Sequence, residues 1–329
     1  MNQNDYTHLL VLPHLKVQNA NAITSPLTHG FPSITAFLGL IWALERKTRA
    51  VGLNLAFNAV GVVCHDHDEQ VTGGGFVKSF CLTRNQFQLR EEKEKANKDV
   101  LGSPAIVEEG RIHLELSLVL AVWAEDWNQE SQRRDKQIIA DLVQGMRIAG
   151  GSLLPSAARY RPWVADFTSS NPDDRAAEFR KLRARLLPGT ALVARDDLID
   201  RRLAELKANQ PEATRLDAWL SLSRINWQHD PAANDGKGAW QHDRKGLGWV
   251  VPIPVGYGAL GELHAAGSVP NARDADTPFR FVESLYSMGE WIGPHRLHRP
   301  EDLLWYADSQ PEQGLYRCRN DYRTPEPTL

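Results

Sequence analysis

The densest group of side chains that could do chemistry in this sequence is the run Cys64-His65-Asp66-His67-Asp68-Glu69. Imidazole and carboxylate groups are common metal ligands, so its two His-Asp pairs suggest a metal-dependent phosphohydrolase. Successive side chains of a strand point to opposite faces, however, and we favour the polar end of a strand that enters a turn. The pair Glu108-Glu109 could supply an acid and a base, but a charged turn before a strand is the simpler interpretation. The sequence also has no G-x-S-x-G, P-loop or H-E-x-x-H motif, and by itself it does not predict an enzyme.

The polar stretch between residues 18 and 33 suggests a different chemistry. It places amides, hydroxyl groups, a histidine and an aromatic ring between an expected strand and an expected helix. Amides can read base edges, aromatic rings stack on bases, and a helix N-terminus can hold a phosphate. We therefore expect contact with RNA here, although a well-capped loop would look the same. The expected roles are base-edge reading by Gln18, Asn19 and Asn21, stacking by His29 or Phe31, and helix capping by Ser33.

A third stretch, MRIAGGS at residues 146–152, combines a cation with a glycine pair. Gly150 and Gly151 would let the backbone approach a polymer closely, and Arg147 could neutralise a phosphate beside them. The alternative is that the two glycines cap the C-terminus of a helix.

Composition limits the class of protein. The 329 residues include 38 Lys and Arg against 41 Asp and Glu, and a net charge of −3 argues against nucleic-acid binding through bulk charge alone. The three cysteines form no C-x-x-C pair, which fits a reducing compartment and neither a disulfide framework nor a zinc knuckle. No basic segment precedes the first apolar run, and the longest apolar run, residues 37–44, is too short to span a membrane. We expect a cytoplasmic protein without a membrane partner.

Hydrophobic periodicity predicts a mixture of strands and helices. Ser33 is expected to cap a helix over residues 34–49, because apolar residues recur there at helical spacing. The other elements expected in the first half are strands at 8–17, 53–64, 76–82 and 111–123, a solvated loop or short helix at 85–104, and a helix at 132–148 that ends at Gly150-Gly151. In the second half we expect helices at 172–187, 196–209 and 213–227, a mobile Gly-rich stretch at 234–248, and strands at 249–254, 279–283 and 303–306. The order favours an α+β fold with a ferredoxin-like core, insertions and a helical lobe.

Several long runs form a series along nearly the whole chain. The first is QNANAITSPLTHGFPSITAFLGLIWAL at residues 18–44. The later runs are AIVEEGRIHLELSL (105–118), MRIAGGSLLP (146–155), RLLPGTALV (185–193), GWVVPIPVGY (248–257), NARDADTPFRFVESLYSMGEWIGPHRL (271–297), DLLWY (302–306) and GLYR (314–317). Together they resemble the Csy-two family, the Cas-five-type subunit of type I-F CRISPR surveillance complexes. Motifs of this length are highly specific, and the stretches 85–104 and 234–247 contribute least.

The resemblance implies an RNA-recognition-like (ferredoxin-like) core with a protruding thumb element and a helical insertion. It implies a core with thumb over residues 1–155, a helical insertion over about 156–247, and a segment at 248–329 that completes the core and a partner interface. The implied function is non-catalytic and needs no cofactor: the subunit holds the repeat-derived 5′ handle of the CRISPR RNA. The implied partners are the large Cas-eight-type subunit, a Cas-seven-type backbone subunit and target double-stranded DNA near the protospacer-adjacent motif.

The residues and the resemblance agree on where RNA should bind. Besides the stretch at 18–33 and the Gly-Gly segment, Arg84 and Asn85 are candidates for contact with the RNA backbone, and Arg273, Arg280 and Arg296 are further RNA-binding candidates in a C-terminal stretch. Near the last three, Phe279 and Trp291 are expected in the core or at the large-subunit interface. The acidic net charge and the lack of an RNP-type aromatic motif fit a protein that reads one fixed RNA end within an assembly.

Two enzymatic alternatives remain open at this point. One is a metal-dependent phosphohydrolase built on His65, Asp66, His67 and Asp68. The other is a metal-independent RNA endonuclease with His29 as general base. Hydrolysis that needs a divalent ion would favour the first, and RNA cleavage that resists a chelator would favour the second.

Overall fold

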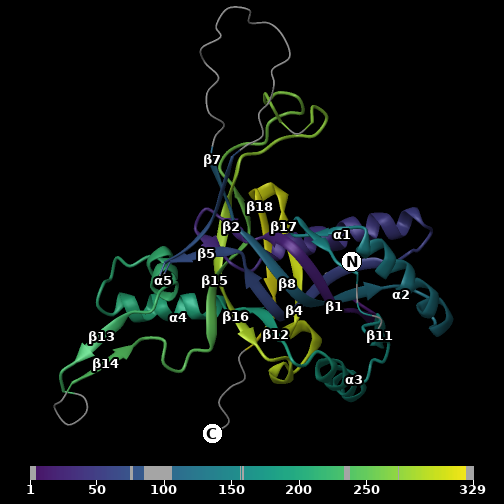
Figure 1. Ribbon diagram of the computed structural model, residues 1–329, viewed down its shortest axis with the longest axis horizontal. Coiled ribbons are helices and arrows are strands. Elements are labelled where there is room, and N and C mark those ends of the chain that lie inside the picture. Colours follow the sequence, from purple (N-terminus) through teal and green to yellow (C-terminus); the bar gives the residue numbers. More distant parts are fainter. Residues whose placement is uncertain are drawn as a thin grey trace, which may run out of the picture.

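The computed structural model describes residues 5–74, 77–84, 106–155, 157, 159–232, 238–272 and 274–323. In these residues the chain combines five α-helices with a large antiparallel sheet (Figure 1). The helices are α1 (Ile34–Ala50), α2 (Gln129–Gln144), α3 (Pro172–Arg185), α4 (Asp196–Lys207) and α5 (Arg215–Leu222). The expected mixture of helices and sheet is confirmed, while the ferredoxin-like arrangement of the core stays a prediction.

The large sheet is assembled from segments that are far apart in the sequence. Its strands are β1 (His8–Asn21), β4 (Ala56–Glu69), β8 (Arg111–Trp123), β9 (Arg147–Ile148), β10 (Gly151–Leu153), β11 (Trp163–Asp166), β12 (Thr190–Ala194), β15 (Trp249–Ala259), β16 (Val282–Ile292), β17 (Leu304–Gln310) and β18 (Leu315–Asn320). Their order is β12-β16-β15-β18-β17-β4-β8-β1-β10-β9, and β11 also pairs with β1. Two strands of the segment 156–247, β11 and β12, thus belong to this sheet.

The sheet curls back on itself at β4. One edge of β4 pairs with β8 along most of its length. The other edge pairs with β17 at Val60 and Gly61, and with β12 at Val63 and Cys64. Because β12 also pairs with β16, the strands from β12 through β17 form a closed ring with β4. Trp305 is fully buried there, and its indole N–H donates to the Leu192 carbonyl at 2.8 Å.

Both faces of the central strands are covered, which explains their nearly continuous apolar sequence. In β1, Leu10 and Leu12 face a core that includes α1 and α2, while Leu9 and Val11 face a second core with α3. A third, smaller core joins α4 and α5 to β15 and β16. Burial on both faces holds the polar ends of these strands in fixed positions.

Among the described residues, three smaller sheets lie outside the main one. They are β2 (Ile23–Ser25) with β3 (Thr28–His29), an arm of β5 (Val71–Gly74), β6 (Val77–Arg84) and β7 (Ile106–Glu109), and a hairpin of β13 (Trp227–Asp230) with β14 (Ala239–His242). The short helices η1 (Pro294–Arg296), η2 (Pro300–Asp302) and η3 (Pro311–Gln313) accompany the C-terminal strands. Figure 1 shows the β5–β7 arm and the β13–β14 hairpin projecting from the body in different directions. None of the helices in the described ranges has the length and apolar composition needed to cross a membrane.

The structure corrects several expected boundaries. The helix expected over 132–148 ends at Gln144 with Gly145 as its cap, and residues 147–148 form β9 instead. The last helix is shorter than expected, and the strand placed at 279–283 lies mainly further on, as β16. β12, β13, β14 and β18 were not expected. The charged stretch at 85–104 and part of the Gly-rich stretch, 234–237, lie outside the described residues.

Candidate nucleic-acid interface

A cleft of about 720 Å³ opens where the loop before α1 meets the main sheet. One side is the loop at residues 24–34, and the opposite side is the first half of β15. The polar end of β4 and the start of β12 complete its walls. The lining residues are Thr24, His29, Gly30, Phe31, Pro32, Ser33, Ile34, Cys64, His65, Asp66, His67, Glu69, Ile112, Pro188, Gly189, Thr190, Leu192, Trp249, Val251, Pro252, Ile253, Pro254 and Trp291. The cleft therefore brings together three of the residues expected to contact RNA, His29, Phe31 and Ser33.

Aromatic rings form one wall of this cleft. The Phe31 ring meets Trp291 edge-on at 4.8 Å between centroids and is stacked on Phe37 of the core at 5.7 Å. Trp249 lies 6.2 Å from Trp291 on the adjacent strand and is 55% exposed. Phe31 is thus held by the core, while Trp249 offers an open ring face. Of the two, Trp249 is the better platform for stacking.

Polar groups also line the cleft. His29 is exposed, and its Nδ1 lies 3.2 Å from a carboxylate oxygen of Glu69. Asp66 accepts the backbone N–H of His67 at 2.9 Å. Ser33 caps α1 as expected, accepting the backbone N–H of Thr35 at 3.3 Å. None of the described residues that line the cleft is a lysine or arginine.

His65 is already engaged within the protein. Its Nδ1 lies 2.6 Å from the Pro188 carbonyl oxygen and its Nε2 lies 2.7 Å from Ser117 Oγ. A carbonyl oxygen can only accept, so Nδ1 carries the proton and Nε2 accepts from the serine hydroxyl. Burial lowers the pKa of His65, which agrees with this neutral form. Burial also raises the pKa of the Cys64 thiol to about 12, so this thiol is no ready nucleophile.

The ligand set expected for a phosphohydrolase is not assembled. With both ring nitrogens of His65 bonded, this residue has no free lone pair for a metal ion. Within the described residues, no three His, Cys, Asp or Glu side chains gather in a way that could hold a metal. The run at 64–69 is instead the polar end of β4, as the favoured interpretation proposed, although the chain continues through Gln70 directly into β5 and not into a turn.

A second group of expected residues lies beside the cleft, at the end of β1. Gln18 pairs with Ser152 of β10, and the Asn21 N–H donates to the Ala149 carbonyl at 2.9 Å. The side chains of Gln18, Asn19 and Asn21 are exposed. We call these three residues, together with the β9–β10 hairpin, the amide edge.

Both asparagines of the amide edge also form hydrogen bonds within the protein. Asn19 has a positive φ of 58°, and its N–H donates to His113 Nδ1 at 3.1 Å. The Asn21 side chain donates to the Ile23 carbonyl at 2.7 Å and accepts the Ile23 N–H at 3.2 Å. No described hydrogen bond involves the side-chain amide of Gln18 or Asn19, so these two are better placed than Asn21 to read a base.

The structure overturns the helix-cap interpretation of the glycine pair at 150–151, while close approach to a polymer there stays a prediction. The pair does not cap α2, because that helix ends five residues earlier at Gly145. Gly150 takes a φ of +80° in the turn between β9 and β10, and Arg147 donates to its carbonyl at 3.3 Å. A side chain at Gly151 would lie 2.7 Å from the Ala20 nitrogen. Gly151 thus allows close approach to β1 of the same chain, and it leaves Arg147 exposed on the hairpin.

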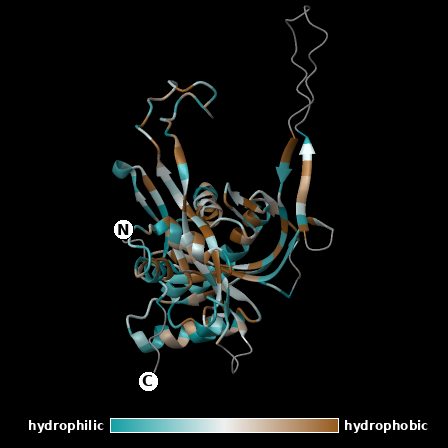
Figure 2. Ribbon diagram, turned by 90° about the vertical axis from the view of Figure 1, so that its left-hand side faces the viewer, coloured by the Kyte–Doolittle hydropathy of each residue, from teal (hydrophilic) through white to brown (hydrophobic). Residues whose placement is uncertain are grey.

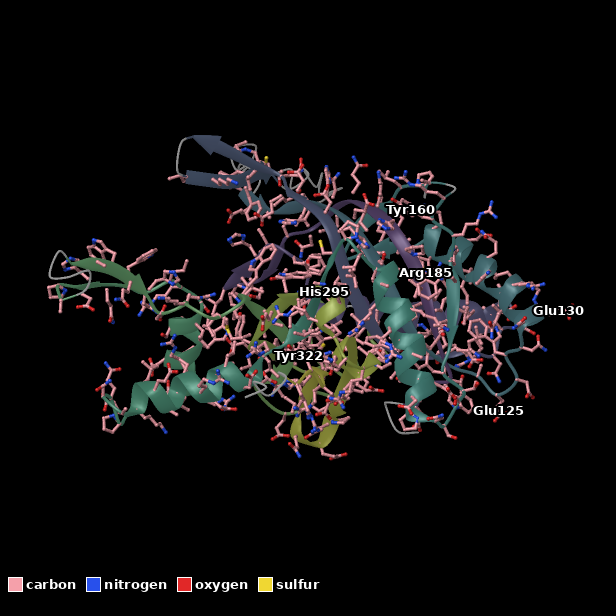
Figure 3. The ribbon with its side chains drawn as sticks, turned by 90° about the horizontal axis from the view of Figure 1, so that it is seen from below. Glu125, Glu130, Tyr160, Arg185, His295 and Tyr322 are labelled. Atoms are coloured by element: carbon pink, nitrogen blue, oxygen red, sulfur yellow. The ribbon has the colours of Figure 1, made fainter. Side chains whose placement is uncertain are left out.

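The remaining candidates are scattered. Arg84 is exposed at the end of β6, on the projecting arm. Arg280 donates to the Pro311 carbonyl at 3.1 Å. Arg296 lines a separate cleft of about 370 Å³ beside Tyr322, on the side of the molecule shown in Figure 3. Asn85 and Arg273 lie outside the described residues. The structure thus brings together the candidates from 18–33 and 147–151, but not Arg280 or Arg296.

Sequence reasoning missed Trp249 and His113. Trp249 follows Gly248, where any side chain would collide with Glu290, and it begins the apolar run VVPIP of β15. A tryptophan at the exposed start of an otherwise buried strand is a usable signal, but its position beside β4 depends on pairings that are distant in sequence.

Comparison with known proteins agrees with the sequence signature. The chain matches the family model described as CRISPR-associated protein (Cas_Csy2) over residues 10–318. It is 42% identical over 327 residues to the CRISPR-associated protein Csy2 of Pseudomonas aeruginosa (strain UCBPP-PA14), and the match covers 96% of each protein. The resemblance read from the sequence is thus confirmed, and the chain belongs to the Csy2 family of CRISPR-associated proteins.

Proposed function

We propose that this protein is a non-catalytic subunit of a type I-F CRISPR surveillance complex and that it binds the 5′ handle of the CRISPR RNA. Its partners in this proposal are a large Cas-eight-type subunit and a Cas-seven-type backbone subunit, with target duplex DNA nearby. Membership of the Csy2 family supports the assignment to a Csy complex.

The amide edge is the observation that carries the RNA-binding part of the proposal. It places an exposed glutamine and two exposed asparagines on β1, and Arg147 on β9, which is separated from β1 only by β10. Side-chain amides can hydrogen-bond base edges, and an arginine next to them can neutralise a phosphate. Because β1 is buried on both faces along its first half, these groups are presented by a rigid strand.

The non-catalytic part of the proposal is supported by the state of the candidate nucleophiles and bases. Ser117 and His65 form a hydrogen-bonded pair, but Ser117 is only 1% exposed. The pKa of the Cys64 thiol is raised, and His29 is paired with Glu69 on the surface. A binding role requires none of these groups to react.

Co-purification tests the proposal. The tagged chain is expressed with its neighbouring operon products and a repeat-spacer RNA, and the eluate is analysed for protein and RNA. We expect a complex that contains the large subunit, the backbone subunit and RNA with an intact 5′ handle. Elution of the tagged chain alone, in cells that contain all the other products, would contradict the proposal.

A binding measurement then tests the amide edge itself. Gln18→Ala in the assembled heterodimer with the large subunit should weaken binding of handle RNA. The loss should depend on the handle sequence, because a base-edge contact is specific for its base. Gln137→Ala, at an exposed position of α2, provides a matched control that should bind like the wild type. If the two variants bound handle RNA equally well, Gln18 would not be part of the RNA interface.

A further inference from the structure

The cleft beside the amide edge has the composition of a nucleobase pocket. Its lining includes the aromatic residues Trp249, Trp291 and Phe31, together with Asp66 and the His29–Glu69 pair. Single-stranded RNA is commonly recognised by unstacked bases that stack on aromatic rings and hydrogen-bond along their edges. A volume of about 720 Å³ is large enough for one base with its sugar at the mouth.

The charges of the cleft select a base over a phosphate. The described lining residues include two carboxylates and no lysine or arginine, so a phosphate inside would be repelled. A carboxylate instead accepts hydrogen bonds from an exocyclic amine, as aspartate and glutamate do with cytosine N4. Glu69 already lies next to His29, whereas the Asp66 carboxylate accepts only the backbone N–H of His67 among its described hydrogen bonds. Asp66 is therefore the acceptor better placed for a ligand.

Trp249 supplies the stacking surface. Its ring is tilted against Trp291 at 6.2 Å and against His67 at 6.4 Å, yet it is 55% exposed. A large aromatic side chain left open at the mouth of a cleft is an energetic cost that a bound base would remove. Its place is fixed, because it pairs directly with Trp291 across β15 and β16.

The cleft and the amide edge are continuous along the chain. Ala22, next to Asn21, accepts the Gly30 N–H at 2.8 Å, and His29 and Gly30 line the cleft. An RNA strand bound along the amide edge can therefore keep its phosphates near Arg147 while one of its bases enters the cleft beside His29.

We propose that this cleft receives a single unstacked nucleobase of the handle RNA, one that carries an exocyclic amine. The base stacks on Trp249 and donates its amine to Asp66, while its phosphates stay outside. The inference rests on the proposed binding of the CRISPR RNA handle and adds the site, the class of base and the residues that read it.

The test uses the heterodimer of this chain with the large subunit and a set of handle RNAs, each with one abasic position. In the wild type, one abasic position should weaken binding by about tenfold, the range expected for loss of one stacked base. In Trp249→Ala, an abasic nucleotide at the same position should cause no further loss of binding. In Trp249→Phe, the loss of binding at that position should return. Trp42→Ala, 40% exposed on α1 and outside the cleft lining, serves as the matched control and should behave like the wild type.

A second variant tests the choice of base. At the position found above, a base without an exocyclic amine should weaken binding to the wild type, and Asp66→Asn should reduce this discrimination. The inference is overturned if Trp249→Ala responds to every abasic position as the wild type does. It is also overturned if Trp249→Ala changes only the recovery of the large subunit, because the cleft would then be a protein contact. Failure of intact handle RNA to bind the wild type would instead remove the proposed function itself.

Discussion

At the scale of single residues, His29 combines two properties that a general base would also have. It is exposed at the rim of the cleft, and its Nδ1 faces Glu69 at 3.2 Å. We expect His29→Ala to leave the length of mature CRISPR RNA unchanged in cells that contain the separate processing endonuclease. RNA blotting with a repeat probe measures this directly. Accumulation of precursor RNA while the complex still assembles would restore the endonuclease alternative.

His65 makes the stability of the protein depend on pH. Burial lowers its pKa below the ordinary 6.5, with a further contribution from His14, whose ring is stacked on it at 4.0 Å. Glu115 and the Pro188 carbonyl act in the opposite direction. As the pH falls through about 6.5, the unfolded chain takes up a proton that folded His65 resists, so the free energy of unfolding must decrease.

The corresponding prediction is a smaller pH dependence in His65→Gln. Glutamine can still donate to Pro188 and accept from Ser117, but it does not titrate. Urea unfolding between pH 7.5 and 5.5 should show a smaller loss of stability in this variant than in the wild type. Part of the loss should remain, because burial also lowers the pKa of His8. His295→Gln, at an exposed position on η1 (Figure 3), should follow the wild type, and equal slopes in all three proteins would contradict the assignment.

Some site residues could be predicted from the sequence and others could not. Ser33 was found because a cap and the helix that it begins are adjacent in the chain. The exposure of Gln18 and Asn21 was likewise visible in a polar stretch after an apolar strand. Trp249 could not be placed, because its position near His67 depends on β15 and β4 belonging to one closed ring.

At the scale of elements, the β9–β10 hairpin is expected to hold a phosphate through Arg147. This side chain is exposed and bonds within the hairpin only to the Gly150 carbonyl at 3.3 Å. For single-stranded nucleic acid, removing one phosphate contact reduces the slope of the logarithm of the binding constant against the logarithm of the salt concentration by about 0.7. Arg147→Ala should show this change for every handle sequence alike, measured by titration at several salt concentrations. Arg180→Ala, at an exposed position of α3, is the control, and an unchanged slope in Arg147→Ala would rule out the contact.

The same hairpin depends on the absence of a side chain at Gly151. A Cβ atom there would lie 2.7 Å from both the Ala20 nitrogen and Val17 Cγ1. Gly151→Ala should therefore destabilise the protein by about 1–3 kcal/mol, the usual cost of overpacking. Gly39→Ala is the contrasting control: the new methyl on α1 meets nothing within 4 Å and should raise stability by about 0.5–1 kcal/mol. Thermal unfolding measures the stability of both variants relative to the wild type. A Gly151→Ala variant as stable as the wild type would show that β1 and β10 can move apart without cost.

Elements were predictable where local pattern determined them. β8 was expected at its observed bounds, because apolar residues alternate along residues 111–123 without interruption. The end of α2 was misplaced, since the amphipathic pattern continues past Gln144 into residues that pair with β10. β12 has only five residues, and it is a strand because β4 and β16 lie on either side of it. Long-range pairing of this kind has no signal in a short window of sequence.

At the scale of the whole molecule, the chain exposes apolar side chains on each of its projections. Figure 2 shows the β5–β7 arm and the loop before β16 rising on opposite sides of the body, with hydrophobic colour on both. The exposed residues are Val77, Leu82 and Ile106 on the arm, Leu260, Leu263 and Phe281 around the loop, and Trp227 and Trp240 on the β13–β14 hairpin. Exposed apolar groups that recur on projecting elements are typical of surfaces that bind a partner.

The stretch at 279–292, which contains the Phe279 and Trp291 expected in the core or at the large-subunit interface, is divided between two environments. Phe281 and Val282 are exposed, whereas Met288 and Ile292 are buried inside the protein as part of β16. Only the beginning of the stretch is therefore available to another subunit. The rest is needed for the ring of strands that holds the cleft together.

We therefore expect the chain to depend on its partner. Expressed alone, it should aggregate or be recovered poorly, because the exposed apolar groups on its projections will associate with one another. Co-expression with the large subunit should yield a monodisperse complex in size-exclusion chromatography with light scattering. Phe281→Ser should lower the recovery of the large subunit on the tagged chain, while Val51→Ser, an exposed apolar position after α1 on the body, should not. A chain that is monodisperse and binds handle RNA without any partner would show that its projections need no covering subunit.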